Sequence, residues 1–432
     1  MIFPISIQRK SSLATIVCWF VLAAAALIGS GIKAAEPDVK STPVAVLQAH
    51  TAPHHGLRVE AGRFTRDGAV YRGIGVNFFD CFMRMLADDP AEAEAARARC
   101  EAGFAELRAF GIPFVRFNAS GFYPKDWRLY QRDPQAYFAR LDALVAAAEK
   151  HGVGLVPSLF WFVFTPPVLA DEPVRAWGDP ASKTHALMRR YVEEVAARYR
   201  GSPAIWAWEF GNEYNLGTDF PDQPALWKKW FHPSLGMPAA PRPDERLTSA
   251  MMQAAWTAFA ETARKLDPHR PLFTGNAMPR TAARHLRLEQ SWAADTRDAW
   301  IAELAWQNPD PVDALSVHFY PFPGDDGTGL KDAPLDGTLD ACAEAARASG
   351  KPLWLGEFAA APGSDLATRA EQWRAIIAAL EKHGVTLAAA WVYDFPQQPD
   401  LTFSGRDETR VLLEILREAN QRWLAMDAPA TR

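Results

Sequence analysis

Apolar residues along the chain gather into eight short runs, separated by longer stretches of mixed apolar and charged residues. The short runs predict β-strands over Tyr71–Phe78, Phe114–Asn118, Gly154–Phe160, Ile205–Phe210, Pro271–Thr274, Ala314–His318, Leu353–Gly356 and Ala388–Tyr393. The stretches between them have helical spacing and predict helices over Ala91–Phe110, Pro134–His151, Thr184–Tyr199, Leu247–Leu266, Ala282–Gln307, Leu339–Ser349, Leu366–His383 and Thr409–Trp423.

This alternation of strands and helices predicts an α/β fold with a parallel sheet. An open, doubly wound sheet is one arrangement, but a closed (β/α)8 TIM barrel fits the count of eight better. We expect one catalytic domain with extended loops after its strands, over 165–182, 215–246 and 322–335. In a barrel the catalytic groups stand at the C-terminal ends of the strands.

The N-terminus has the features of a secretory signal. Arg9 and Lys10 precede the apolar stretch Leu13–Ile28, and the small residues Ala34 and Ala35 follow. We therefore expect export to the periplasm or the outside and no membrane contact after cleavage, with an uncleaved N-terminal anchor as the alternative. The predicted division is a signal peptide, a linker or N-terminal arm, and the catalytic domain, over 1–35, 36–57 and 58–432.

Composition narrows the function classes. The 432 residues carry a formal net charge of -5 with no basic run in the body of the chain, which disfavours a nucleic-acid partner. The chain has 16 Trp, and indole faces suit sugars. Outside the signal, Cys81, Cys100 and Cys342 permit one disulfide, with Cys81–Cys100 as one possible pairing.

Polar and aromatic residues follow the predicted strands at their C-terminal ends. In chain order they are Asn77, Arg116 and Asn118, Phe160-Trp161-Phe162, Asn212-Glu213, His318-Phe319-Tyr320, Glu357 and Trp391. Glu213 and Glu357 are two carboxylates at one end of the barrel. Such a pair is the minimum equipment for hydrolysing a glycosidic bond, because one carboxyl must protonate the leaving oxygen while the other attacks or activates water.

In these motifs the sequence resembles the retaining glycoside hydrolases of the (β/α)8 clan, most closely family 5, the cellulase/mannanase family. The resemblance covers roughly residues 58–423. It rests on Val115-Arg116-Phe117-Asn118, Trp208-Glu209-Phe210-Gly211-Asn212-Glu213, Val317-His318-Phe319-Tyr320, Leu355-Gly356-Glu357-Phe358 and Trp391, each at the end of its proper strand.

The resemblance implies that Glu213 is the general acid/base and Glu357 the nucleophile. Asn212 would hydrogen-bond the sugar 2-hydroxyl. Arg116 would keep the nucleophile ionised, since a nearby cation favours the carboxylate. Tyr320 would donate to the nucleophile.

Two further residues complete the implied site. His318 would line the subsite beside the acid/base, and Trp391 would form the floor under the sugar. The resemblance also predicts a cis peptide between Trp391 and Val392. Glu209 stands four residues before the acid/base on the same side of its strand, so we expect a buried, paired structural acid there.

The chain departs from the family pattern at two positions. Tyr214 follows the Asn-Glu pair where Pro is frequent, and Trp161 stands at the end of the third strand where His is frequent. Both departures put the substrate in question rather than the chemistry. Packing and sugar stacking are both open for Trp161 and for the loop residues Trp177, Trp227 and Trp230.

We therefore expect a retaining β-glycoside hydrolase that cleaves β-linked glucan or mannan by double displacement, without cofactor or metal. A non-catalytic carbohydrate-binding protein on a degenerate barrel is the alternative from another class. An exo-acting β-glycosidase or a transglycosidase also stays open, as does the oligomeric state. An intracellular metabolic barrel is disfavoured by the signal and by the absence of a glycine-rich phosphate pattern.

Overall fold

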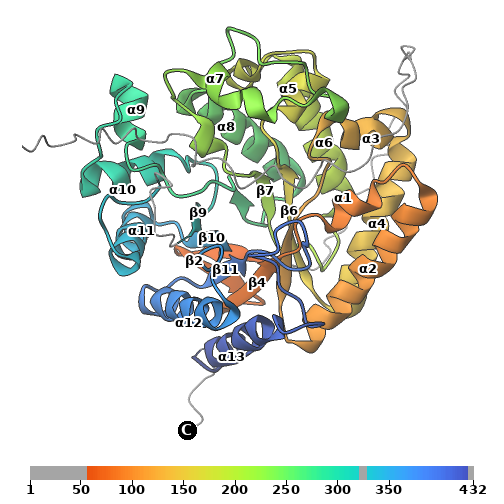
Figure 1. Ribbon diagram of the computed structural model, residues 1–432, viewed down its shortest axis with the longest axis vertical. Helices are drawn as coiled ribbons and strands as arrows, with labels where there is room; N and C mark the ends of the chain where they lie inside the picture. Colours follow the sequence, from red (N-terminus) through yellow and green to blue (C-terminus); the bar gives the residue numbers. More distant parts are fainter. Residues whose placement is uncertain (1–55, 321–327, 427–432) are drawn as a thin grey trace, which may run out of the picture. The chain divides into compact units, whose positions relative to one another are not determined.

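The computed structural model describes residues 56–320 and 328–426 (Figure 1). The predicted signal peptide, nearly all of the predicted linker and the first part of the predicted loop 322–335 lie outside the described residues.

Eight parallel strands form one sheet in the order β8-β7-β6-β5-β4-β11-β10-β9. They are β4 Gly73–Asn77, β5 Phe114–Asn118, β6 Gly154–Phe160, β7 Trp208–Gly211, β8 Leu272–Phe273, β9 Leu315–Phe319, β10 Leu353–Phe358 and β11 Leu387–Ala390. The two outermost strands approach each other, because Asp313 N–H donates to Leu272 O over 2.9 Å and Gly275 N–H to Ser316 Oγ over 3.3 Å. The sheet is therefore a nearly closed barrel, which confirms the predicted fold class.

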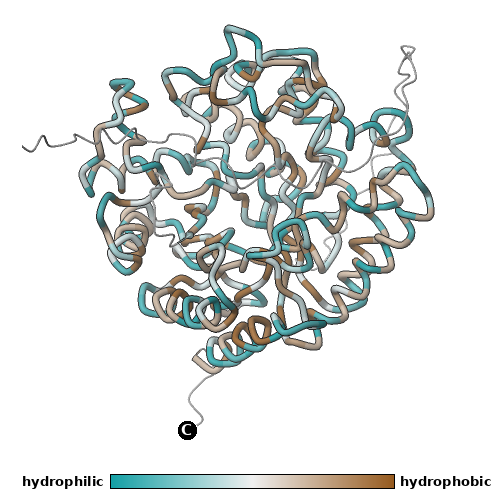
Figure 2. Tube along the Cα trace, viewed as in Figure 1, coloured by the Kyte–Doolittle hydropathy of each residue, from teal (hydrophilic) through white to brown (hydrophobic). Residues whose placement is uncertain are grey.

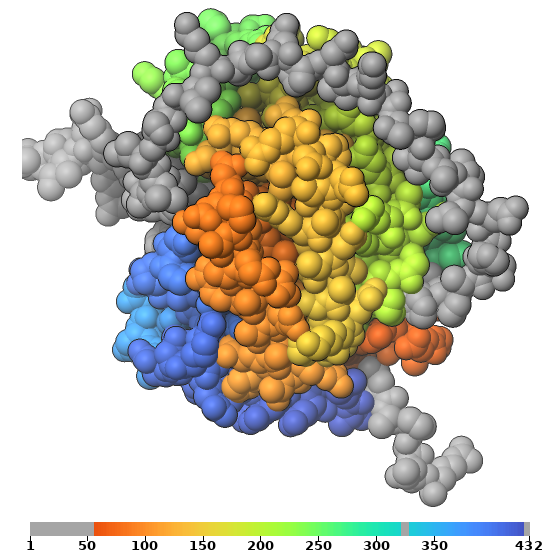
Figure 3. Space-filling view, turned by 90° about the vertical axis from the view of Figure 1, so that its right-hand side faces the viewer, coloured from red at the N-terminus to blue at the C-terminus, as the bar shows by residue number. Residues whose placement is uncertain are grey.

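The helices follow the strands, as the alternation predicted. They are α1 Cys81–Met85, α2 Pro90–Ala109, α3 Arg128–Arg132, α4 Pro134–His151, α5 Thr165–Leu169, α6 Lys183–Tyr199, α7 Gln223–Trp227, α8 Ser249–Leu266, α9 Ala283–Glu289, α10 Arg297–Trp306, α11 Leu335–Ser349, α12 Leu366–Lys382 and α13 Arg410–Met426. Figure 3 shows α2 and α4 side by side on the outer surface, with the C-terminal helices next to α2. Local signals set the bounds of α4, where the Asp133 side chain accepts from Ala136 N–H and Gly152 ends the helix at φ 64°.

The predicted helix Ala282–Gln307 is wrong, since this stretch forms the two helices α9 and α10. Gln290 at φ 53° ends α9, and the Thr296 side chain accepts from Ala299 N–H to begin α10. The Asp295 carboxylate accepts from the backbone of Arg284 and His285, which folds the connecting segment back onto α9. These bonds satisfy N–H groups in the first turn of α9, which have no partner within the helix.

A small three-stranded antiparallel sheet, called the hairpin segment and absent from the predicted strands, precedes the barrel. It consists of β1 Arg58–Glu60, β2 Arg63–Arg66 and β3 Ala69–Val70, paired antiparallel. Phe64 from this hairpin is fully buried and meets Phe273 at 5.9 Å. Both belong to the apolar cluster near the N-terminal ends of the strands. Apolar segments are also frequent on the central strands in Figure 2. The hairpin segment therefore closes the N-terminal end of the barrel with apolar side chains.

Two further expectations concern covalent and membrane structure. Cys81, Cys100 and Cys342 are free, buried thiols, so the permitted disulfide is not formed. Within 56–320 and 328–426, none of the helices combines the length and hydropathy needed to cross a bilayer.

Candidate active site

The two predicted acids face each other at the C-terminal end of the barrel. Glu213 lies two residues after the end of β7, and Glu357 lies in β10 with no exposed surface. A carboxylate oxygen of Glu213, a ring nitrogen of His318 and a carboxylate oxygen of Glu357 all lie within 4.8 Å of one another. The acids therefore stand close enough to act on one bond between them.

Arg116 on β5 organises the buried charges below this pair. Its Nη1 donates to Glu357 Oε1 over 2.7 Å, its Nε to Glu209 Oε1 over 2.7 Å and its Nη2 to Asn212 Oδ1 over 2.7 Å. Burial alone would lower the pKa of Arg116, but the charges of Glu209 and Glu357 raise it overall. The guanidinium therefore stays charged and orients three neighbours at once.

The environment of Glu357 acts on its ionisation in two directions. Burial raises the pKa of Glu357 above its ordinary value of 4.5, because the charged form is desolvated. The Arg116 guanidinium and the hydroxyl of Tyr320, which donates to Glu357 Oε2, oppose this rise. Burial also raises the pKa of Tyr320, so its hydroxyl keeps the proton that it donates.

His318 lies between the two acids in its neutral form. Its Nδ1 is 2.9 Å from Glu213 Oε1 and 3.7 Å from Glu357 Oε1. Burial lowers the pKa of His318 to about 4, so at neutral pH the ring is neutral and carries a single proton. In the tautomer with that proton on Nδ1, the ring donates to Glu213 Oε1. On the other side, a Cβ at Gly356 would stand 2.7 Å from His318 Nε2. Glycine before the nucleophile is therefore required to leave room for the imidazole.

The same three residues span a distance that a metal ion could bridge. However, both oxygens of Glu357 already accept hydrogen bonds, one from Arg116 and one from Tyr320. A cation beside this carboxylate would also face the guanidinium charge. The donor set is better suited to orienting a reacting carboxylate than to holding a metal, and the predicted absence of a metal stays a prediction.

Two tryptophans of the site, Trp391 and Trp161, directly follow the strands β11 and β6. The Trp391–Val392 peptide is cis, as predicted, and Trp391 Nε1 donates to Gln398 Oε1 over 2.7 Å. Trp161 is buried and holds the Arg116 guanidinium 4.4 Å from its ring centroid. Trp161, at the position where the family often has His, therefore packs against the central cation.

Glu209 confirms the prediction of a buried, paired acid. It is fully buried, accepts from Arg116 and accepts from Trp354 Nε1 over 2.9 Å. Asn77 adds a partner that was not among the predicted site residues. Its Oδ1 accepts from Arg116 Nη1 over 3.0 Å, and its Nδ2 donates to Gly356 O over 2.9 Å. Its place at a strand end was the signal that could have identified it.

Gly275, just after β8, was also not foreseen. It adopts φ 73°, and a Cβ there would stand 1.9 Å from Gly211 O. Its own carbonyl accepts the backbone N–H of Glu213 over 2.8 Å, while Glu213 adopts φ 55°. The close approach of these two backbone segments sets the direction of the Glu213 side chain, and only glycine permits it.

The other aromatic candidates are packing residues. Tyr214 is buried and donates to Phe160 O over 2.7 Å. Trp177 is fully buried, and its Nε1 donates to Val163 O over 2.9 Å. The remaining two loop residues are also less than a tenth exposed, Trp227 against Phe164 and Trp230 against Phe162.

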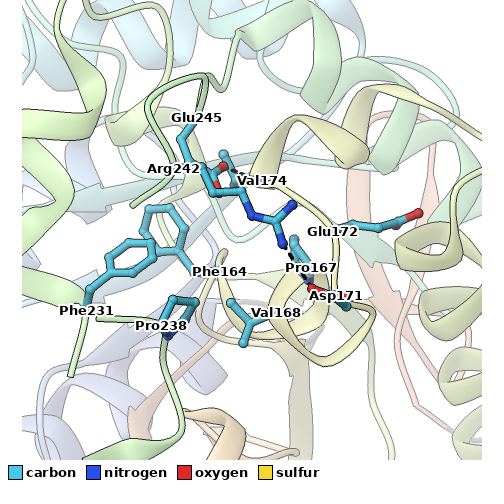
Figure 4. Close-up of a pocket in the computed structure, with 10 residues that line it drawn as sticks. All are labelled: Phe164, Pro167, Val168, Asp171, Glu172, Val174, Phe231, Pro238, Arg242 and Glu245. Carbon is cyan, nitrogen blue, oxygen red and sulfur yellow. Dashed lines mark hydrogen bonds and ion pairs between the residues drawn. The ribbon is translucent and has the colours of Figure 1, made fainter. Parts of the chain in front are cut away.

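A separate small pocket of about 40 Å³ lies between α5 and the long loop after β7 (Figure 4). Figure 4 shows Arg242 reaching Asp171, a pair joined over 3.0 Å, with the rings of Phe164 and Phe231 close together. The buried Glu245 carboxylate accepts from Val174 N–H over 2.6 Å. This pocket shares no residue with the acid pair.

Comparisons with known proteins bear on this geometry. The model of the family described as cellulase (glycosyl hydrolase family 5) matches residues 94–394. A probable mannan endo-1,4-β-mannosidase F of Aspergillus flavus is 40% identical over 82 residues, 17% of each chain. A probable mannan endo-1,4-β-mannosidase A of the same organism is 26% identical over 215 residues, 45% of this chain and 52% of that protein. The chain thus spans only part of these relatives.

Among solved structures, the endo-1,4-β-mannanase from Rhizomucor miehei superposes with a TM-score of 0.61. The two chains are 14% identical, and the match covers 86% of this chain and 99% of that one. At this identity the likeness shows a shared barrel fold.

Proposed function

The chain belongs to glycosyl hydrolase family 5, and from this we propose that it is a retaining β-glycoside hydrolase acting on β-linked mannan or manno-oligosaccharides. The observation that carries the proposal is the carboxylate pair. Oxygens of Glu213 and Glu357 lie within 4.8 Å of each other, and Arg116 and Tyr320 hold the second carboxylate. Retaining enzymes separate their carboxyl groups by about 5–5.5 Å, whereas inverting enzymes need about 6.5–9.5 Å to admit a water.

In the first step of the proposed reaction, the Glu357 carboxylate attacks the anomeric carbon. The bond to the leaving oxygen breaks, and that oxygen takes the proton of the Glu213 carboxyl. Arg116 stabilises the nucleophile as an anion and, through Asn212 Oδ1, fixes the Asn212 amide. The Asn212 Nδ2 is then left to donate to the sugar 2-hydroxyl.

In the second step, water resolves the covalent glycosyl-enzyme. Glu213, now a carboxylate, takes a proton from water while the oxygen of that water attacks the anomeric carbon and Glu357 leaves. The neutral His318 supports both roles of Glu213, because its Nδ1–H donates whether the carboxyl is charged or protonated. No cofactor enters either step.

Mannan is the proposed substrate because the relatives that match are described as mannan endo-1,4-β-mannosidases. We further propose that the protein is exported. The support is the order of Arg9 and Lys10, the apolar stretch Leu13–Ile28 and Ala34-Ala35. N-terminal sequencing of protein recovered outside the cytoplasm would give a start after Ala35; an intact Met1 in the membrane fraction would contradict cleavage.

The test of activity uses the mature protein beside its Glu357→Gln variant. Both are incubated with mannan, cellulose derivatives, mixed-linkage glucan, xylan and aryl β-glycosides, and released reducing sugar or aglycone is measured. We expect release from β-mannosides by the wild type alone, with retention of the anomeric configuration in the first product. Release from glucans alone would overturn the mannan assignment. Binding without release would instead make the protein a carbohydrate-binding module.

A further inference from the structure

This inference rests on the proposed function, because the roles of Glu213 and Glu357 fix which way the substrate lies across the site. Glu213 protonates the leaving oxygen, so the departing part of the substrate lies on the β7 side of the barrel. The sugar attacked by Glu357 lies on the far side of the anomeric carbon. In the strand order, β11 stands four places from β7 in either direction, so Trp391 lies across the barrel from Glu213. The retained, or glycone, side of the site is therefore the rim formed by β11, β4, β5 and β6.

This rim carries a continuous set of aromatic side chains, here called the glycone wall: Phe79, Phe122, Trp161 and Phe395. The ring of Phe79 lies 5.6 Å from Trp391, 4.7 Å from Trp161 and 5.3 Å from Phe395. Phe122 follows at 6.2 Å from Phe79. Every member is less than a tenth exposed, so these rings are in contact with one another rather than with solvent.

The wall is anchored at both ends. Trp161 stacks under the Arg116 guanidinium that holds the nucleophile. At the other end Phe122 stacks on Phe162 at 4.8 Å with an interplanar angle of 15°, and Phe162 meets Trp230 at 5.8 Å. To accept a second sugar beyond Trp391, these packed rings would have to separate, which would lose buried contact area.

On the opposite side, the described residues that follow β7 and β8 are arranged differently. Trp292, between α9 and α10, is 50% exposed and stacks on Phe220 at 5.3 Å with an interplanar angle of 23°. The Arg280 guanidinium lies 4.8 Å from the Phe220 ring and donates to Leu216 O over 2.8 Å, just after Glu213. An exposed indole braced from the acid/base turn is suited to the face of a sugar in the departing chain.

We infer that the enzyme is exo-acting: its glycone side takes one sugar, the non-reducing terminal residue of a β-mannoside chain, and the departing chain leaves past Trp292. The packed glycone wall blocks the continuous groove that internal cleavage requires. The exposed face of Trp292 leaves a path for departing chains of different lengths.

The test uses the wild-type protein with borohydride-reduced β-1,4-mannopentaose and a soluble mannan. We expect mannose and reduced mannotetraose as the first products, and little loss of viscosity for a given release of sugar. Mannobiose or mannotriose as a first product, or an early fall in viscosity, would overturn the exo assignment while supporting the proposed hydrolase. No cleavage of any β-mannoside would overturn both.

Two variants test the role of the glycone wall in the same assay. Phe79→Ala opens the centre of the wall, and we expect the ratio of internal to terminal cleavage to rise at least about threefold. The control is Trp306→Ala, an aromatic residue on α10 that is 39% exposed and flanked by Arg287, and it should leave the ratio unchanged. An unchanged ratio in folded Phe79→Ala would contradict the role of the wall; if that variant does not fold, the wild-type products decide.

Discussion

The two ends of the barrel are both buried, but opposite kinds of side chain fill them. At the N-terminal end, Leu57 and Phe64 from the hairpin segment pack on Phe273 and Trp354. At the C-terminal end, Arg116 and Glu357 are charged groups without exposed surface. Apolar burial at the N-terminal end stabilises the folded state. At the C-terminal end, hydrogen bonds must compensate for the desolvation of the buried charges.

Glu209 and Trp354 connect the two ends. The indole of Trp354 belongs to the apolar cluster, yet its Nε1 donates to Glu209. Glu209 in turn accepts from Arg116, which holds the nucleophile. A structural acid thus stands between the stabilising end and the chemical end. The charges used for chemistry therefore depend on buried residues below them that take no part in the reaction.

The largest expected effect comes from removing the central cation. Arg116→Met leaves Glu209 and Glu357 buried without their shared partner, so we expect the free energy of unfolding to fall by about 3–5 kcal/mol. We also expect kcat to fall at least about 100-fold, because the nucleophile loses the charge that favours its anion. Urea denaturation and kinetics on an aryl β-mannoside measure the two effects. The control is Arg97→Met, which removes an exposed ion pair with Glu94 and should change neither the free energy of unfolding nor kcat. An Arg116→Met protein with wild-type stability and activity would contradict the dependence of the C-terminal end on this buried cation.

At the opposite end, Phe64→Ala should separate stability from catalysis. Truncating this fully buried ring leaves a cavity, and we expect a loss of about 3–5 kcal/mol in the free energy of unfolding. The kcat of the folded fraction, measured well below the unfolding temperature, should be unchanged. Leu288→Ala, at a residue 56% exposed, is the control and should alter stability by no more than about 0.5 kcal/mol. A large fall in kcat for Phe64→Ala would show that the two ends are coupled.

Gly275→Ala tests the backbone contact that directs Glu213. Its Cβ would meet Gly211 O, so the two segments must move apart and the acid/base must shift. We expect kcat to fall about 10- to 100-fold with a smaller change in KM, as displacement of a reacting group by about 1 Å has such effects. Gly201→Ala, where an added Cβ meets nothing within 4 Å, is the matched control; equal kinetics in the two variants would contradict the positioning role.

The smallest expected effect is a shift along the pH axis. Because burial raises the pKa of Glu357, the wild type should lose activity with falling pH at a value above 4.5, as the nucleophile gains a proton. Tyr320→Phe removes a donor that favours the anion, so the acidic limb of kcat/KM should move to still higher pH. Tyr199→Phe, which removes a hydrogen bond to Asp142 outside the site, should leave that limb in place. A shift to lower pH in Tyr320→Phe would contradict the assigned donor.

Much of the fold could be predicted because the barrel strands lie in apolar runs that alternate with stretches of helical spacing. The hairpin strands are only 3, 4 and 2 residues long, so no periodicity marks them, although Asp67-Gly68 is a turn signal. The break between α9 and α10 was missed because helical spacing continues across it. Gln290 in the left-handed conformation, rather than a Gly or Pro, ends α9 there.

The site could be predicted in part because strand ends of a barrel converge. Glu213, His318 and Glu357 were therefore foreseeable as neighbours, and the structure brings them within 4.8 Å. The neutral state of His318 was not foreseeable, because it comes mainly from burial, with the Arg116 charge adding to it, and together these lower the pKa of His318 to about 4. Nor was the burial of Trp177, because the sequence of a loop does not show which of its residues face the protein.

The sequence by itself determined the order of strands and helices and the chemical groups at each strand end, since both follow from local periodicity and residue type. Only the tertiary structure decided how Arg116 divides its hydrogen bonds between Glu209 and Glu357, that Gly275 directs Glu213, and that Phe79 and Trp161 close one rim while Trp292 stays exposed on the other. The physical reason is that desolvation, close backbone approach and ring packing depend on residues far apart in the chain.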